Sequence, residues 1–362
     1  MIDRRALLLG VGGTLVAPCA DATEWTPIDP AEAGFPADLG TRIDQFAGGK
    51  NIHGVIVVRH GRIVVERYYA GEDQVRDSEG RMHVERVAFS PRHSHDLRSV
   101  TKSIIGLLYG IALRDGKVPP LDAPLLAQFP QYDDLPDMAQ RRGWTIRHAI
   151  TMTLGMDWNE EISYDDPRNG QTAMERSPDR ARYALEQPIV AVAGERWIYS
   201  AGATTLIGKI IEHGVGASIH DYARRVLFDP LGLGPTEWRS VRAGEPIFAS
   251  GLAMRPRDLA RVGQLLLDGG SVGERQVVPA DWLEASFTPA VRIDDRRHYG
   301  YHWYVGNTVR GRDLRWIGAF GNGGQRLFAL PEPAIVVVVT AGSYNQRAAS
   351  NDLVGDVLEG IR

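Results

Sequence analysis

Leu97-Arg98-Ser99-Val100-Thr101-Lys102-Ser103 is the stretch of sequence that decides the fold, and the apolar run Ile104-Ile105-Gly106-Leu107-Leu108 follows it. The pattern predicts a helix over 99–114. Residues three apart lie on one face of a helix, so Lys102 is within side-chain reach of Ser99. A serine hydroxyl needs a neighbouring base to become a good nucleophile, and lysine is such a base only when its pKa is lowered. The apolar residues that follow favour burial of the amine, so we predict Ser99 as nucleophile and Lys102 as its base.

Lysine is rare in this chain, which makes the Ser-x-x-Lys spacing more informative. Only four lysines occur, at positions 50, 102, 117 and 209, against a large excess of arginine. Arginine cannot be deprotonated in proteins, so a base at position 102 has to be lysine. The alternative interpretation is a serine that caps a helix beside a solvated lysine. A helix start at Ser99 also offers unpaired backbone N–H groups, and one of them can form half of an oxyanion hole.

Two further segments place polar groups where a ligand could reach them. Tyr199 stands in Arg196-Trp197-Ile198-Tyr199-Ser200, just before a predicted helix, and we predict it as a second base or proton shuttle. Phe320-Gly321-Asn322-Gly323-Gly324-Gln325 precedes a predicted strand, and its glycines would let the backbone approach a ligand closely. We expect the backbone N–H of Gln325 to complete the oxyanion hole with that of Ser99.

The hydrophobic periodicity outward from Ser99 predicts a sheet that both ends of the chain build. Alternating residues on either side of His60-Gly61 predict a hairpin of strands over 55–59 and 62–68. No further strand is expected until four near the C-terminus, over 300–305, 313–317, 325–330 and 335–340, and the last is apolar enough to be covered on both faces. Helices are predicted over 99–114, 146–152, 180–186, 203–212, 219–226, 257–267 and 348–358. The fold class is therefore α+β, an antiparallel sheet built from N- and C-terminal segments and flanked by helices, with a large mainly helical insertion.

Composition places the chain among globular proteins with small-molecule partners. Its 362 residues are 43% hydrophobic and 24% charged, enough to bury a large core. We expect a sheet lobe of residues 23–98 and 290–362, a mainly helical lobe of residues 99–289, and an active site between them. The net charge is −4 and no run is rich in lysine or arginine, so the sequence gives no sign of a basic surface that would bind nucleic acid or an anionic membrane. No cofactor is expected, and the oligomeric state is left open.

The first residues follow the order of a secretory signal. Arg4 and Arg5 precede an apolar stretch over 6–17 and then Ala20-Asp21-Ala22, so we predict a signal peptide over 1–22. The stretch is too short to span a bilayer comfortably, and the paired arginines resemble a twin-arginine signal. Cys19, the only cysteine, fits a lipoprotein box poorly because proline precedes it. We expect an exported protein, periplasmic or extracellular, with no membrane span in the mature chain; the alternative is a buried N-terminal helix.

Ser99-Val100-Thr101-Lys102, Tyr199-Ser200 and Gly321-Asn322-Gly323-Gly324-Gln325, in this order, resemble the three motifs of the serine β-lactamase and penicillin-binding protein superfamily. The resemblance covers residues 54–340 and is closest to the class C-like branch, which includes esterases and 6-aminohexanoate-dimer hydrolases. It implies a β-lactamase/DD-peptidase-like fold and an acyl-enzyme on Ser99, with Lys102 and Tyr199 as the other catalytic residues. It also implies that a small-molecule ester, amide or lactam binds beside Asn322, Gly323, Gly324 and Ala201.

Two positions depart from the family pattern. Ala201 replaces the asparagine of the second motif, which in β-lactamases contacts both the substrate and the catalytic lysine. Asn322 replaces the lysine or histidine of the third motif, so the cation that pairs with a β-lactam carboxylate is missing. We therefore predict hydrolysis of an ester or amide. The alternatives are a DD-peptidase or β-lactamase, and a catalytically inactive relative that binds a ligand.

Three other groups of residues receive structural interpretations. Glu160 and Glu161 could correspond to a deacylating glutamate, but a carboxylate pair in a loop is usually solvated. His93, His95 and Asp96 match no zinc spacing, so no metal site is predicted. An aromatic cluster before the C-terminal strands is interpreted as strand packing rather than as the mouth of a cleft. It consists of Tyr299, Tyr301, His302, Trp303 and Tyr304.

Overall fold

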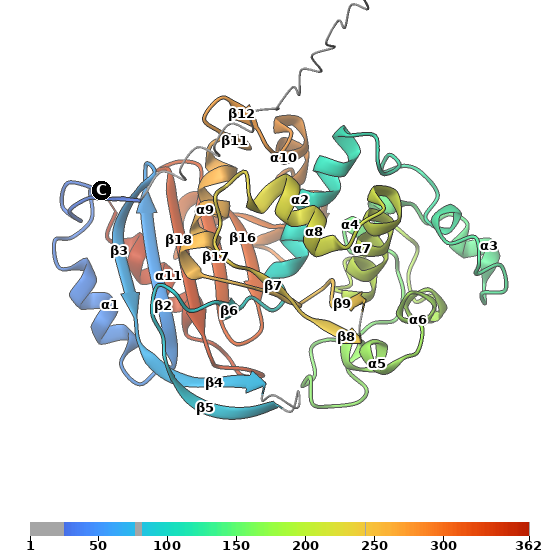
Figure 1. Cartoon of the computed structure of the whole chain (residues 1–362), viewed down its shortest axis with the longest axis horizontal. Helices are drawn as coiled ribbons and strands as arrows, with labels where there is room; N and C mark the ends of the chain where they lie inside the picture. The colour runs from blue at the N-terminus through green and yellow to red at the C-terminus, as the bar shows by residue number, and fades with distance from the viewer. Residues whose placement is uncertain (1–24, 77–81, 243, 362) are drawn as a thin grey trace, which may run out of the picture.

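A nine-stranded sheet forms the centre of the computed structural model, which describes residues 25–76, 82–242 and 244–361. The strands lie in the order β1-β3-β2-β18-β17-β16-β15-β14-β13, and every neighbouring pair is antiparallel except β1 with β3. Their bounds are β1 Thr26–Pro27, β2 Ile52–Arg59, β3 Arg62–Tyr68, β13 Val291–Arg292, β14 Arg297–Tyr299, β15 Tyr304–Val309, β16 Arg312–Gly321, β17 Gln325–Leu330 and β18 Ile335–Ala341. Figure 1 shows the blue N-terminal strands β2 and β3 next to the red C-terminal strands, which confirms the predicted α+β sheet built from both ends of the chain.

Helices surround the sheet and fill the middle of the chain. Their bounds are α1 Leu39–Ala47, α2 Val100–Arg114, α3 Met138–Arg141, α4 Ile146–Ile150, α5 Gly170–Arg176, α6 Arg180–Glu186, α7 Ala201–Val215, α8 Ile219–Ala223, α9 Pro256–Leu267, α10 Ala280–Ser286 and α11 Ser350–Glu359. A 3-10 turn covers Leu126–Gln128, and a π-helical turn, Arg224–Phe228, continues α8. The predicted helices are all present, with ends that differ by a few residues.

The central strands are apolar on both sides because helices cover both faces of the sheet. On β18, Val337 and Val339 pack in one core with α1 and α11, whereas Val336 and Val338 pack in the other core with α2 and α9. Successive strand residues point to opposite faces, so an unbroken valine run serves two cores at once. The prediction that this strand is covered on both faces is confirmed.

Helix α2 is buried around nearly its whole circumference, which the apolar run after Ser99 predicts. Its residues from Val100 to Ala112 are all buried. The Trp282 ring packs so closely on Gly110 that an added Cβ would overlap it, and the Trp282 indole N–H donates to the Gly106 carbonyl at 3.0 Å. The segment that begins at Ser99 is therefore anchored in a closely packed part of the molecule.

The sequence predicts no strand between residues 69 and 299, but the structure contains several there. β4 Ala70–Arg76 and β5 Met82–Ala88 form a polar hairpin, and β6 His95–Asp96, β10 Leu252–Met254 and β7 Glu237–Trp238 form a small sheet. Further short pairs are β8 Ser240–Arg242 with β9 Glu245–Pro246, and β11 Ser271–Val272 with β12 Arg275–Gln276. The hairpin lacks the apolar alternation of a half-buried strand, because much of its surface faces solvent.

The predicted strand over 300–305 is wrong for most of its length. Gly300 to Trp303 form a turn closed by the Gly300 N–H on the Trp303 carbonyl at 2.9 Å, and β15 begins only at Tyr304. His302 lies in the left-handed region, with φ 61°, which no strand residue adopts. Aromatic residues are enriched in this segment because the turn is buried.

Three further expectations concern a signal peptide, a division into two lobes and the absence of a membrane span. The predicted signal peptide over 1–22, with Cys19, lies outside the described residues. The division into two lobes stays a prediction; helix α9, inside the proposed helical lobe, packs on the sheet. Among the residues that the structure describes, no helix is long and apolar enough to cross a bilayer.

Candidate active site

Ser99 and Lys102 lie side by side at the start of α2, as the three-residue spacing predicts. Ser99 occupies the N-cap position, and the Lys102 amine lies 3.0 Å from the Ser99 hydroxyl, within hydrogen-bonding distance. Only 8% of Ser99 and 1% of Lys102 is exposed. Arg98, immediately before Ser99, has the unusual φ of 48°, and its N–H donates to the Asp96 carboxylate. The chain just before Ser99 is thus held in a sparsely populated conformation.

The surroundings of Lys102 favour a neutral amine. Burial lowers the pKa of Lys102, while the nearby carboxylates of Glu160 and Glu175 oppose this. The amine also donates to the Ala249 carbonyl at 3.3 Å, which leaves its lone pair available to Ser99. A buried amine of lowered pKa can accept the proton of the serine hydroxyl, which an ammonium cannot.

Tyr199 is the third predicted catalytic residue, and the structure brings it to the pair. The Lys102 amine lies 4.7 Å from the centroid of the Tyr199 ring. Burial raises the pKa of Tyr199, the Glu160 charge adds to the rise, and a hydrogen bond with Ser99 opposes it. The phenol therefore stays protonated at neutral pH and can pass a proton on rather than act as a permanent anion.

Glu160 is the residue of this site that the sequence interpretation missed. Its carboxylate is 2% exposed and lies 4.0 Å from the Lys102 amine, whereas the neighbouring Glu161 is exposed. It accepts hydrogen bonds from the Trp158 indole at 2.6 Å, the Tyr164 hydroxyl at 3.1 Å and the Ala201 N–H at 2.5 Å. The interpretation of a solvated carboxylate pair is therefore wrong for Glu160. Trp158, two residues before it, was the available signal, because a buried indole N–H needs an acceptor nearby.

Ala201 is expected beside the substrate, and the structure places its N–H against the Glu160 carboxylate. The Ala201 side chain is fully buried, and Ala201 is the first residue of α7, capped by Ser200. Its N–H points at Glu160, where the positive end of the helix dipole favours a negative charge. Glu160 thus occupies the neighbourhood of the asparagine that Ala201 replaces.

The predicted glycine turn borders the nucleophile segment. A Cβ added to Gly321 would overlap the Leu97 carbonyl oxygen and lie in tight contact with the Cβ of Arg98. Asn322 lines the cleft, and its amide exchanges two hydrogen bonds of 2.9 Å with Asn345. Gly323 and Gly324 are buried, under Tyr344 and Ser350 respectively. The Gln325 side chain is also buried, bonded through its amide to both backbone groups of Ala341, so only its backbone can serve a substrate.

A cleft of about 710 Å³ opens beside these residues. Tyr164 in its wall donates to Glu160, and Ser250 follows Ala249, whose carbonyl holds Lys102. The lining contains charges of both signs. They are Arg98, Asp165, Glu175, Arg176 and Arg239. Burial raises the pKa of Glu175, while the Gln171 amide, which donates to it at 2.6 Å, and the Arg180 charge oppose this.

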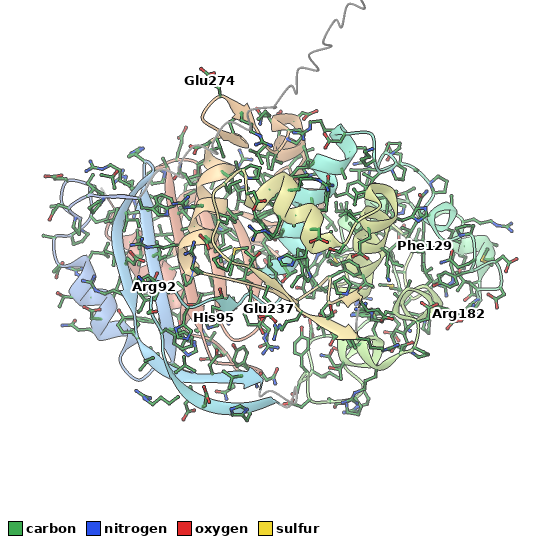
Figure 2. The ribbon with its side chains drawn as sticks, viewed as in Figure 1. Arg92, His95, Phe129, Arg182, Glu237 and Glu274 are labelled. Atoms are coloured by element: carbon green, nitrogen blue, oxygen red, sulfur yellow. The ribbon has the colours of Figure 1, made fainter. Side chains whose placement is uncertain are left out.

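The remaining candidate residues separate in space. His93 is exposed, and Asp96 forms ion pairs with Arg98 and Arg239, so His93, His95 and Asp96 do not converge. His95 lies on β6 in the middle of the molecule (Figure 2), and its Nε2 is 2.8 Å from Nδ1 of His53. The aromatic cluster is packing, as interpreted: Tyr299, Tyr301, His302 and Trp303 are buried, and Tyr304 stacks on Phe320 at 4.6 Å.

Comparison with known proteins gives a consistent result. The protein-family model described as Beta-lactamase matches residues 40–358. The 6-aminohexanoate-dimer hydrolase of Paenarthrobacter ureafaciens is 24% identical over 348 residues, covering 89% of this chain and 81% of the relative. The structure of EstCE1, a hydrolase with promiscuous acyltransferase activity, has a TM-score of 0.70 at 18% identity, covering 90% of this chain and 98% of EstCE1. The octameric penicillin-binding protein homologue from Pyrococcus abyssi has a TM-score of 0.65 at 18% identity, covering 89% of this chain and 76% of the homologue.

These findings confirm the β-lactamase/DD-peptidase-like fold that the three motifs imply. The family model extends over most of the chain and includes the segments that carry Ser99, Tyr199 and Asn322. The chain therefore belongs to the beta-lactamase family, within the serine β-lactamase and penicillin-binding protein superfamily of serine hydrolases.

Proposed function

We propose that this serine hydrolase cleaves an ester or amide bond of a small molecule through an acyl-enzyme on Ser99. The observation that carries the proposal is the buried Ser99–Lys102 pair, with 3.0 Å between hydroxyl oxygen and amine nitrogen and a Lys102 pKa lowered by burial. The names of two relatives, a 6-aminohexanoate-dimer hydrolase and the hydrolase EstCE1, agree with this class of reaction.

The reaction has two halves. Ser99 Oγ attacks the carbonyl carbon while its proton passes to neutral Lys102, and the proton then moves through Tyr199 to the leaving oxygen or nitrogen as that bond breaks. The acyl group is left as an ester on Ser99. Water attacks this ester, its proton returns through the same groups to Ser99, and the carboxylic acid is released.

We assign the oxyanion hole to the backbone N–H groups of Ser99 and Gln325. The close packing of Gly321 on Leu97 and Arg98 supports this, because it holds the turn before Gln325 against the nucleophile segment. Each donor would contribute on the order of 3 kcal/mol to transition-state stabilisation.

Asn322 favours a neutral ester or amide over a β-lactam. Its amide is already engaged with Asn345, and it carries no charge to pair with the carboxylate of a penicillin. A chromogenic cephalosporin and a fluorescent penicillin test the alternative of a β-lactamase or DD-peptidase. Turnover or stable labelling at rates above those for short-chain nitrophenyl esters would favour that alternative.

Export is part of the proposal and rests on the sequence alone. The order of arginines, apolar stretch and Ala20-Asp21-Ala22 supports cleavage after Ala22. N-terminal sequencing of the protein recovered from a periplasmic fraction should begin at Thr23. An intact Met1 in the cytoplasmic fraction alone would contradict it.

Labelling with a fluorophosphonate tests the nucleophile directly. We expect intact mass spectrometry to find one adduct per chain, peptide mapping to place it on Ser99, and Ser99→Ala to lose both the adduct and ester hydrolysis. Ser103→Ala is the matched control, since Ser103 lies on the same helix but donates to the His302 carbonyl at 2.6 Å. Absence of an adduct, or an adduct that survives in Ser99→Ala, would refute the mechanism. Measurable ligand binding without turnover of esters, amides or lactams would point to an inactive relative.

A further inference from the structure

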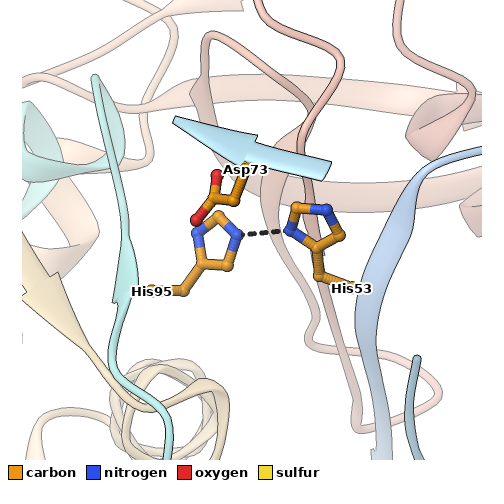
Figure 3. Close-up of side chains that lie close together, drawn as sticks. All are labelled: His53, Asp73 and His95. Carbon is orange, nitrogen blue, oxygen red and sulfur yellow. Dashed lines mark hydrogen bonds between the residues drawn. The ribbon is translucent and has the colours of Figure 1, made fainter. Parts of the chain in front are cut away.

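We propose that His53, Asp73 and His95 form a binding site for one divalent transition-metal ion of the zinc type. The three side chains come from β2, β4 and β6 and converge in the interior (Figure 3). One potential ligand atom of each lies within 4.8 Å of the other two. His53 is fully buried, His95 is 1% exposed and Asp73 is 9% exposed. Neither the catalytic proposal nor the family motifs use this cluster.

The outer nitrogen of His53 must carry a hydrogen. His53 Nε2 lies 3.1 Å from the Glu72 carbonyl and 3.2 Å from Asn51 Oδ1. The orientation of the Asn51 amide is fixed because its Nδ2 donates to the Glu72 carbonyl and its Oδ1 accepts the Glu72 N–H. Both neighbours of His53 Nε2 are therefore acceptors, so Nε2 is the donor and Nδ1 holds the lone pair of the neutral ring.

The same argument applies to His95, and it leaves two lone pairs facing each other. His95 Nδ1 donates to the Asp96 carbonyl at 2.9 Å, so its Nε2 is bare in the neutral ring. His95 Nε2 and His53 Nδ1 are only 2.8 Å apart. Two bare nitrogens at this distance repel each other, so the contact calls for a cation between the rings.

The donor set is that of a zinc-type ion. Two imidazole nitrogens and one carboxylate oxygen supply three ligands, and a water can complete a tetrahedron. Metal-bound histidines characteristically donate their other N–H to a backbone carbonyl or carboxylate, as both rings do here. Tyr344 donates to one Asp73 oxygen at 2.6 Å, which orients the carboxylate. Bonds of about 2.0–2.1 Å at a tetrahedral angle place two nitrogens about 3.3 Å apart, so the rings would separate by about half an ångström.

Packing holds the rings in place from outside. Phe89 stacks on His53 with ring centroids 4.1 Å apart and also contacts His95. Gly71 lies so close to the His53 ring that a Cβ at this position would overlap it. The ion would join three separate strands, β2, β4 and β6. Of its ligands, His95 lies four residues before Ser99 in the sequence. Its expected effect is to stabilise this part of the fold, without contact with the substrate.

Zinc and cobalt binding to the untagged full-length chain test the proposal. After chelator treatment, we expect calorimetry to find one zinc site per chain and the melting temperature to rise with zinc concentration. Cobalt at the same site should give the intense visible bands of a tetrahedral ion. Asp73→Asn and His53→Gln should weaken zinc binding by more than the 10–100-fold that changes in outer-shell partners typically cost. His220→Gln is the matched control, since that half-buried ring bonds to Thr236 away from the site.

Fluorophosphonate labelling of Ser99 reports whether each variant is folded, so loss of the metal site and loss of the fold can be told apart. If the variants do not fold, NMR of the imidazole nitrogens in the unaltered chain tests whether zinc binds to the two histidines. Zinc should shift the signals of His53 Nδ1 and His95 Nε2 together. Three results would overturn the proposal. The histidine signals could stay unchanged, with a proton shared between the rings; the unaltered chain could bind zinc no more tightly than the Asp73→Asn variant does; or the cobalt spectrum could be that of an octahedral ion.

Discussion

In the proposed mechanism Lys102 acts as a base only while its amine is neutral, and arginine at the same position cannot be neutral. The amine is buried against Ser99, Ala249 and the Tyr199 ring. Lys102→Arg keeps a positively charged side chain of similar length but removes the base. We expect kcat/KM for a nitrophenyl ester to fall by about 10²–10⁴-fold, the usual contribution of general-base catalysis. Lys209→Arg, on α7, is the control, and a Lys102→Arg enzyme with near-normal kcat/KM would contradict the assigned role.

Glu160 opposes the effect of burial on the pKa of Lys102. Its charge raises the pKa of Lys102 against the effect of burial. Glu160→Gln keeps an oxygen acceptor for the Ala201 N–H but removes the charge, so the pKa of Lys102 should fall further. The acid limb of the pH profile of kcat/KM is then expected to move to lower pH, while Glu161→Gln, at the exposed neighbour, leaves it unchanged. A limb that moves to higher pH would show that Glu160 acts in another way.

At the scale of single elements, α2 packs closely against α10 through Gly110 and Trp282. Gly110→Ala would push a methyl group into the Trp282 ring. Overpacking of this kind typically lowers the free energy of unfolding by about 1–3 kcal/mol. Urea denaturation measures the loss, and combining Gly110→Ala with Trp282→Leu should cost less than the sum of the two single changes. If the changes in the free energy of unfolding were strictly additive, the two residues would not be in energetically significant contact.

The elements also show what could be predicted and why. Ser99 and Lys102 are three residues apart on one helix, so local geometry alone brings them together. Glu160 reaches Lys102, and His53 reaches His95, through contacts between distant segments that no local pattern encodes. The β4–β5 hairpin escapes prediction because exposed strands lack the apolar alternation that marks half-buried ones. The turn over 300–303 resembles a strand in sequence because it is buried and rich in aromatic residues, which are also enriched in strands.

For the whole molecule, a buried amine of lowered pKa makes stability depend on pH. Between the folded pKa of Lys102 and the ordinary value near 10.4, the unfolded chain binds one proton more than the native chain. The free energy of unfolding therefore rises with pH, by up to about 1.4 kcal/mol per pH unit from this group, and the gain is lost as pH falls through the same window. Lys102→Met removes this contribution, so a plot of the free energy of unfolding, from urea denaturation, against pH should have a shallower slope for the variant below the ordinary lysine pKa of about 10.4. Equal slopes would contradict a lowered pKa.

The protonation state of Lys102 in the intact protein can be measured directly, because the chain has only four lysines. With isotope-labelled lysine, NMR titration follows each side chain, and Lys102→Met identifies the signal of interest. We predict that one lysine loses its proton well below the ordinary value near 10.4, while the signals of Lys50, Lys117 and Lys209 move separately from it. If the Lys102 signal instead titrated at or above the ordinary value, Ser99 would have no base at neutral pH and the proposed mechanism would fail.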